Sequence, residues 1–159
     1  MVADSAGNQA TDTETGIIDL TAPTISIDNI ADTNDVTPVL SGQTTGVPAG
    51  SQITLLVTDS NGNTQTLITT TLADGSWSVE ADVIIAEGAF TVEATVSDAA
   101  GNTASDTATG VVDTTAPTIT VDALAPSSDV TPVISGMAEG VPAGTVVSIV
   151  ITDLSLIHI

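Results

Sequence analysis

One long segment occurs twice in this chain: residues 2–59 reappear, shifted by 94 positions, as residues 96–153. The stretch VADSAGN returns as VSDAAGN, and TAPTISID returns as TAPTITVD. About half of the aligned positions are identical. A fixed period of this size is typical of a tandem array, in which function belongs to the array and its joints and not to one pocket.

The repeat divides the chain into one complete unit and two partial ones. Residues 1–19 match the last two strands of a unit, residues 20–113 form a whole unit, and residues 114–153 match the first three strands of another. The final residues 154–159, LSLIHI, depart from the repeat just after Asp153. We expect this tail to be non-native and to have no part in the fold.

The interior of each repeat has to be built almost without aromatic rings. Hydrophobic residues make up 42% of the chain, which is enough to bury a core, but aromatic residues make up 1%, namely Trp77 and Phe90. Aliphatic side chains and threonine methyl groups must therefore fill the interior. Because β-branched residues favour pleated strands and no segment has a convincing helical period, the chain is predicted to be all-β.

Alternation of apolar and polar residues locates the strands. Every second residue from Phe90 to Val96 is apolar, whereas the residues between them are threonine or glutamate, as in a half-buried strand. Turns rich in Gly, Pro, Asn and Asp separate such runs. The complete repeat is predicted to have seven strands, at residues 24–28, 36–44, 52–58, 64–72, 76–82, 89–97 and 103–112. Seven short strands indicate an immunoglobulin-like antiparallel β-sandwich, in tandem repeats of about 94 residues.

The charge of the chain excludes several classes of partner. It has 20 acidic residues and no Lys or Arg, giving a formal net charge of −20. Without a basic patch, nucleic acid and anionic membrane surfaces are not expected partners. No apolar run is long enough to span a membrane, so direct membrane insertion is not expected either.

The residues that enzymes use are nearly absent. The only histidine, His158, lies in the suspect tail, and the chain has no Cys, Lys, Arg or Tyr. Carboxylates remain, but they recur with the repeat, and an active site duplicated in every unit is improbable. The sequence therefore predicts a protein that is not an enzyme, with no catalytic residue and no small-molecule substrate.

Several motifs in order carry a resemblance to a known family. A VDTTAPTITV linker is followed by DVTPVISG, a GVPAG turn, DGSWSVE and TVSDAAGNTASDTATG. Over residues 2–153 this pattern resembles the bacterial immunoglobulin-like repeats of giant surface adhesins and biofilm-associated proteins. The resemblance implies an extracellular location on the bacterial cell surface, and it implies calcium ions held by aspartates between domains.

The aspartates themselves suit a hard cation, because calcium takes about six to eight oxygen ligands and needs no nitrogen or sulfur. In a seven-strand sandwich, the linker from the preceding repeat arrives at the pole that carries the turns after the second, fourth and sixth strands. Asp19 of that linker is expected to approach Asp74 and Asp98, which lie in two of these turns. Three carboxylates would then converge on one joint.

The opposite pole carries a second group of acidic residues, expected to gather beside the outgoing linker: Asp32, Asp35, Asp59, Glu87 and Asp113. Asp113 is the repeat equivalent of Asp19, so both groups could recur along an array. Two metal-free interpretations stay open. An aspartate in a turn often only hydrogen-bonds its own backbone, and acidity alone can keep a secreted protein soluble.

The clustering of acidic residues favours metal binding over these metal-free interpretations, since unpaired carboxylates repel by about 1 kcal/mol per pair at close range in water. The predicted function is a structural extender repeat of a large secreted bacterial adhesin in cell adhesion or biofilm formation, rigidified by calcium at the joints. Its expected partners are the neighbouring repeats of the same chain. The alternative is a ligand-binding immunoglobulin-like module that recognises a host glycan or protein.

Overall fold

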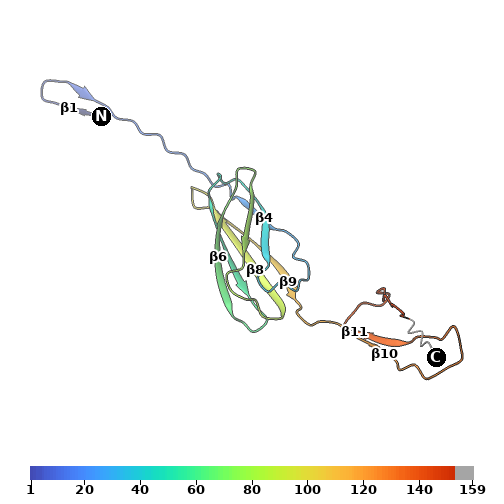
Figure 1. Ribbon diagram of the computed structural model, residues 1–159. Helices are drawn as coiled ribbons and strands as arrows, with labels where there is room; N and C mark the ends of the chain where they lie inside the picture. Colours follow the sequence, from blue (N-terminus) through green and yellow to red (C-terminus); the bar gives the residue numbers. More distant parts are fainter. Residues whose placement is uncertain (153–159) are drawn as a thin grey trace. The chain divides into compact units, whose positions relative to one another are not determined.

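The computed structural model describes residues 1–152, and the predicted tail at residues 154–159 lies outside this part (Figure 1). Every regular element of the described part is a β-strand. None of its residues belongs to a helix long and apolar enough to span a membrane. The chain divides into two compact units, Met1–Thr114 and the part that begins at Thr115.

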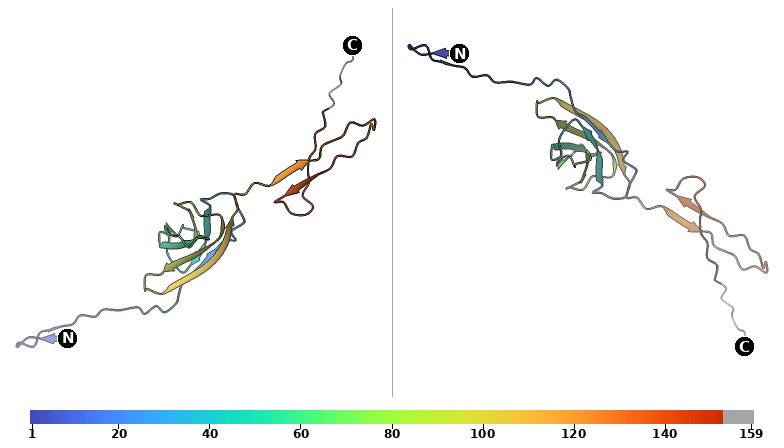
Figure 2. Two further views of the ribbon diagram at one scale, coloured as in Figure 1. Left: turned by 90° about the horizontal axis from the view of Figure 1, so that it is seen from below. Right: turned by 90° about the horizontal axis from the view of Figure 1, so that it is seen from above.

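The first unit contains a seven-stranded sandwich. One sheet has the order β3-β4-β7, with β3 at Thr24–Ile27, β4 at Val39–Thr45 and β7 at Ser76–Glu80. The other has the order β6-β5-β8-β9, with β6 at Thr64–Thr70, β5 at Gln52–Thr58, β8 at Gly88–Ser97 and β9 at Thr103–Val112. All pairs are antiparallel, and the two sheets face each other (Figure 2). The predicted all-β, immunoglobulin-like sandwich is confirmed.

The strands differ from the prediction mainly at their ends. The strand expected at residues 36–44 begins at Val39, directly after Pro38, which has no N–H to pair. The residues before it contact a loop instead: Val36 O accepts a hydrogen bond from Ile85 N at 2.8 Å. The strand expected at residues 64–72 ends at Thr70 because Leu72 already belongs to the next turn.

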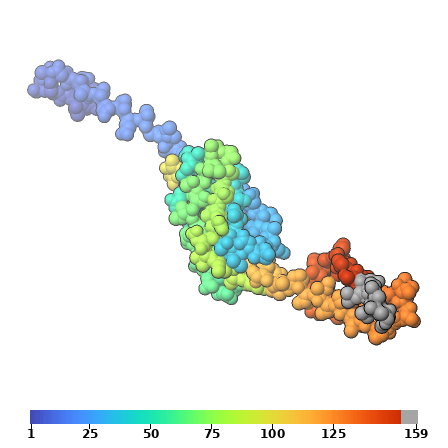
Figure 3. Space-filling view, viewed as in Figure 1, coloured from blue at the N-terminus to red at the C-terminus, as the bar shows by residue number. Residues whose placement is uncertain are grey.

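A hydrophobic core fills the space between the sheets. Along β8, Phe90, Val92, Ala94 and Val96 alternate with exposed or half-buried residues, as predicted. Trp77 of β7 and Phe90 are the largest fully buried side chains. Aliphatic side chains surround them, among them Leu40, Ile53, Leu55, Val57, Leu67, Ile85 and Val112. On the face seen in Figure 3 the sandwich has no deep hollow.

Side chains close the two open sides of the sandwich. On one side, Asp106 of β9 accepts a hydrogen bond from Ile27 N of β3 at 2.8 Å. On the other, Gln65 of β6 pairs with the backbone of Val83 through both its amide oxygen and its amide nitrogen. The first contact satisfies a backbone N–H of the edge strand β3, which would otherwise be free to pair with another chain. The second fixes the loop after β7 against the edge strand β6.

The partial units form less regular structure. β1 (Val2–Ala3) and β2 (Gln9–Ala10) make a hairpin with two residues in each strand. In the second unit, β10 (Thr118–Val121) pairs with β11 (Gly136–Glu139), whereas residues 145–150 form no strand. Two-stranded sheets are marginal in water because one face of each strand pair stays uncovered.

Candidate metal-binding loops at the two poles

The incoming linker docks at the pole predicted from the sequence. Pro23 is buried against Gly46, whose φ is +77°: a Cβ on Gly46 would lie 3.2 Å from Pro23 Cα. The turn after β6 reaches the same pole, since Thr44 N donates to Gly75 O at 2.8 Å. The turn after β8 joins them through Asn102, whose Nδ2 donates to Asp19 O at 3.1 Å.

Asp98 organises the turn between β8 and β9. Its Oδ1 accepts hydrogen bonds from Ala100 N and Asn102 N, both at 2.9 Å, and its Oδ2 accepts one from Asn102 Nδ2 at 2.9 Å. The Asn102 side chain, followed by the backbone N–H groups of the turn, holds the pKa of Asp98 below its ordinary range. The charged carboxylate is therefore the form that this turn stabilises.

The other two aspartates of this pole also bond within their own segments. Asp74 Oδ1 accepts hydrogen bonds from Ser76 Oγ at 2.6 Å and Ser76 N at 3.0 Å, and the Ser76 hydroxyl is the first cause of its lowered pKa. Asp19 Oδ1 accepts from Thr21 N at 2.9 Å. The three aspartates thus lie around one pole, but each carboxylate accepts hydrogen bonds within a different turn or linker: Asp74, Asp98 and Asp19.

At the opposite pole, Asp59 repeats the pattern of Asp98. Its Oδ1 accepts from Asn61 N at 2.9 Å and Asn63 N at 2.8 Å, and its Oδ2 accepts from Asn63 Nδ2 at 2.9 Å. The Asn63 side chain is the largest cause of a lowered pKa of Asp59. Asp35 Oδ1 accepts a hydrogen bond from Thr37 N at 2.9 Å.

The outgoing linker is attached at this second pole. Asp113 N donates to Thr33 O at 2.8 Å, and Thr114 Oγ1 donates to Glu87 Oε2 at 2.5 Å. Asp32 lies beside Thr33 on the exposed surface. Its position in the next repeat is Pro126, so this acidic residue, unlike Asp35 and Asp59, does not recur.

The predicted acidic residues are therefore near the linkers but not gathered into a site. Within residues 1–152, no three acidic or other metal-binding side chains are placed so that they could hold one ion. The donor chemistry, which consists of oxygens alone, suits calcium. The same oxygens accept turn hydrogen bonds in this structure, as the metal-free interpretation of a turn aspartate expects.

Sequence reasoning missed the asparagines that hold these turns. The pattern Asp-x-x-Gly-Asn occurs three times, ending at Asn8, Asn63 and Asn102. The copy at Asp4 makes the same bonds, with Asn8 Nδ2 donating to Asp4 Oδ2 at 2.7 Å. The recurring asparagine, four residues after each aspartate, was the signal in the sequence that could have identified them.

Replacing Asn63 with alanine is expected to raise the pKa of Asp59 toward its ordinary value of about 3.9. Because the folded pKa of Asp59 is lowered, this carboxylate adds stability above its unfolded pKa and loses it as the pH falls through the folded pKa. The variant should thus be less stable than the wild type at pH 7, and the difference should shrink at pH 2. Urea unfolding at both pH values, with a ¹³C titration of the Asp59 carboxyl group, measures this.

The matched control is Asn34→Ala, which alters an exposed asparagine outside the three turns. It should leave the titration of Asp59 unchanged. An Asp59 that titrates alike in the wild type and the Asn63 variant would show that the side-chain amide does not set its pKa.

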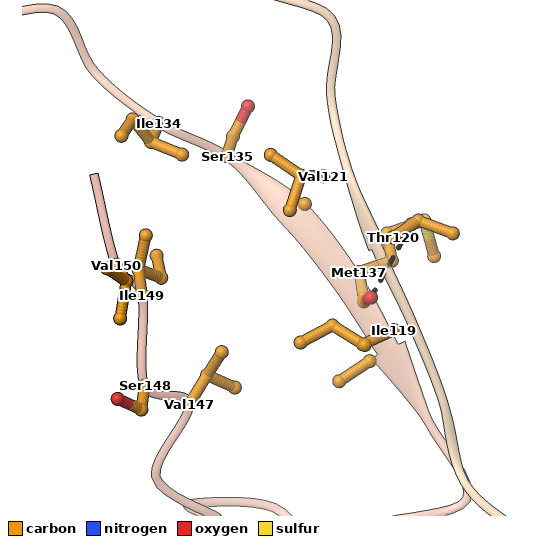
Figure 4. A pocket seen from close by; sticks show the side chains of 12 residues that line it. Ile119, Thr120, Val121, Ile134, Ser135, Met137, Val147, Ser148, Ile149 and Val150 are labelled. Atoms are coloured by element: carbon orange, nitrogen blue, oxygen red, sulfur yellow. Dashed lines mark hydrogen bonds between the residues drawn. The ribbon is translucent and has the colours of Figure 1, made fainter. Parts of the chain in front are cut away.

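A groove of about 460 Å³ in the second unit is lined in part by positions whose repeat equivalents form the core of the first unit. Val147 and Ile149 line it, lying across from Ile119 of β10 (Figure 4). Their repeat equivalents, Ile53 and Leu55, are fully buried in the first unit, where β8 pairs with their strand. The described part of the second unit contains no counterpart of β8.

Several solved structures similar to this chain are repeats or domains of large adhesion proteins. A tetra-tandem repeat in the extending region of a large adhesion protein is 40% identical over 64% of this chain, with a TM-score of 0.50. A Ca²⁺-stabilized adhesin of an Antarctic bacterium is 33% identical over 76% of this chain, which matches 32% of that adhesin's chain, with a TM-score of 0.44. An immunoglobulin-like domain of the M. primoryensis ice-binding adhesin is 33% identical, covering 58% of this chain and 96% of its own, with a TM-score of 0.35.

No curated protein matches the sequence. The chain covers 27% of the tetra-tandem repeat protein, so it corresponds to about a quarter of that structure's length. The family model described as a bacterial Ig-like domain matches residues 17–114, which include all seven strands of the sandwich. This chain therefore belongs to the bacterial immunoglobulin-like domain family.

Proposed function

We propose that this chain is part of the extender region of a large secreted bacterial adhesin, and that its repeats act as spacers in cell adhesion or biofilm formation. The observation that carries the proposal is the route of the chain through the sandwich. The incoming linker docks beside Asn102, next to the β8 end at Ser97, and the outgoing linker leaves beside Gly88, at the other end of β8. Similarity to repeats from the extending region of a large adhesion protein supports it.

A repeat entered at one pole and left at the other adds length to an array. β8 has ten residues, and a strand rises by about 3.3 Å per residue. Each repeat therefore contributes roughly 33 Å plus its loops. Such a spacer needs no pocket, and it acts through the number of copies and the stiffness of the joints between them.

Calcium at the joints is the second part of the proposal. A joint brings together loops of two repeats, so ligands from both sides would complete a site that one repeat does not form by itself. Asp19, Asp74 and Asp98 would contribute on the side of the incoming linker. On the outgoing side the contributing residues would be Asp32, Asp35, Asp59 and Asp113. A divalent ion would supply positive charge, which a chain with 20 acidic residues and no Lys or Arg otherwise lacks.

The test is thermal unfolding, in calcium and in EGTA, of a protein with three complete copies of the repeat at residues 20–113 in tandem, because a joint needs two neighbouring repeats. If calcium binds only the folded state, a concentration of about 100 times the dissociation constant adds about 2.7 kcal/mol to its stability, so the melting temperature should rise. Magnesium at the same concentration should raise it less, because it gives up its water shell reluctantly. Equal melting temperatures in calcium and EGTA would contradict calcium binding.

A pair of charge-matched variants locates the ion. Asp98→Asn removes one negative charge at the pole, and Glu93→Gln removes one from the exposed face of β8, in the middle of the sheet. The calcium-dependent rise should be reduced in Asp98→Asn and kept in Glu93→Gln. The same reduction in both variants would indicate general charge screening and not a site at the joint.

A further inference from the structure

The side chain of Asn102 holds the incoming linker through hydrogen bonds. Its Nδ2 donates to Asp98 Oδ2 within the turn at 2.9 Å, and it also lies 3.1 Å from Asp19 O and 3.4 Å from Thr21 O. Both linker acceptors are backbone carbonyls. The contact is therefore made to the backbone of the linker.

The linker is shaped for this contact by its own bonds. Asp19 Oδ1 accepts a hydrogen bond from Thr21 N at 2.9 Å, which bends the chain so that the carbonyls of residues 19 and 21 both face Asn102 Nδ2. Two residues further on, Pro23 is buried against Gly46. The linker is thus attached to the sandwich at two places before β3 begins.

A different pair of bonds attaches the outgoing linker. Thr33 forms a parallel bridge with the end of β9: Thr33 N donates to Val111 O at 3.0 Å, and Thr33 O accepts from Asp113 N at 2.8 Å. This holds the chain up to Asp113. Unlike the contacts of Asn102, these two bonds are between backbone groups.

Asp19 and Asp113 occupy the same position of the repeat, 94 residues apart. The repeat that precedes this position binds its N–H, as at Asp113, and the repeat that follows binds its carbonyl, as at Asp19. We infer that Asn102 is a latch residue, and that in an array each linker aspartate is held by the repeats on both sides without a metal ion. This inference rests on the proposed extender function and adds to it a second source of stiffness at the joint.

The turn that ends at Asn63 provides a matched control. Asn63 Nδ2 donates to Asp59 Oδ2 in the same way, but this turn connects β5 and β6 at the other pole. Asn63→Ala and Asn102→Ala remove the same bond inside a turn, whereas only Asn102→Ala removes the bonds to the linker. Asn102→Asp keeps the size of the side chain but has no N–H to donate, and it serves as a second variant if the alanine variant folds poorly.

The experiment is ¹⁵N relaxation of the full chain in EGTA. In the wild type, the amides of Asp19, Thr21 and Asp113 should have order parameters near those of β8, about 0.85. In Asn102→Ala and Asn102→Asp, those of Asp19 and Thr21 should fall below about 0.6, the range of flexible backbone. Asp113 should keep its value in these variants, and all three residues should keep theirs in Asn63→Ala.

Two results would overturn the latch: order parameters below about 0.6 at Asp19 and Thr21 in the wild type, or unchanged values in both Asn102 variants. Order that appears only when calcium is added would also overturn it, while leaving the calcium-stiffened extender intact. A flexible Asp113 backbone in the wild type would contradict the inference that the repeats on both sides hold each linker aspartate. Conversely, Asn102 can hold the linker in a protein whose melting temperature does not change with calcium. The latch and the calcium site are therefore tested independently.

Discussion

Replacing Trp77 with alanine is expected to lower the free energy of unfolding of the sandwich by about 3–5 kcal/mol, the usual effect of removing a large buried aromatic side chain. Trp77 is 1% exposed, and it is one of only two aromatic residues in the chain. The side chains around it are aliphatic and already packed, so they can collapse only partly into the space left behind. Urea unfolding at pH 7 gives the difference.

The control is Val39→Ala, because Val39 is 64% exposed on β4. It should change the free energy of unfolding by less than about 0.5 kcal/mol, as surface substitutions usually do. A Trp77→Ala protein within about 1 kcal/mol of the wild type would show that the core closes around the missing ring.

Trp77→Phe separates the ring volume from the indole N–H. The Nε1 atom is buried and has no hydrogen-bond partner in the described part of the chain, and such a group costs about 1–3 kcal/mol. Phenylalanine loses part of the volume but also removes this unpaired donor. Its loss of stability should therefore be well below that of Trp77→Ala.

Gly42→Ala is expected to destabilise the sandwich by about 3 kcal/mol, at the upper end of the usual range for overpacking. Gly42 lies in the middle of β4, and a Cβ there would be 1.9 Å from Ser26 O and 2.5 Å from Trp77 Cζ2. The carbonyl of Ser26 belongs to the paired strand β3, and both distances are too short for a Cβ, so both the strand and the indole ring must move relative to β4. The φ of Gly42 is not positive, so the backbone conformation at this position does not need a glycine. The glycine is needed because there is no room for a Cβ.

Gly16→Ala is the matched control for this substitution. Gly16 also lacks a positive φ, and a Cβ there would meet no atom within 4 Å. Its stability should equal that of the wild type or slightly exceed it, because alanine restricts the unfolded chain. If Gly42→Ala and Gly16→Ala unfold at the same urea concentration, the close packing of β3 and Trp77 on β4 does not limit stability.

Local patterns of the sequence are sufficient to predict where the strands lie. The alternation in β8 is visible without a structure because neighbouring residues of a strand always point to opposite faces. Phe90 lies on the apolar face that this alternation predicts, and it is buried. The strand ends were less accurate, as at Val36, whose carbonyl bonds to Ile85 in a distant loop.

The candidate site shows the limit of this reasoning. The sequence places Asp19, Asp74 and Asp98 at one pole, and the structure agrees on the pole. Whether carboxylates share an ion or hold separate turns depends on distances of a few ångströms between segments far apart in the chain. In the described residues they hold separate turns, and a shared ion remains a proposal for a joint of two repeats.

The repeat, the absence of basic residues and the period-two alternation determined, from the sequence by itself, an acidic tandem array of β-sandwiches. These features are properties of neighbouring residues and of composition. The tertiary structure alone decided that Gly42 makes room for Trp77 and Ser26, and that Asn102 holds the linker at Asp19. Such contacts exist only after strands distant in sequence have paired, because pairing sets which backbone carbonyl or ring each side chain meets.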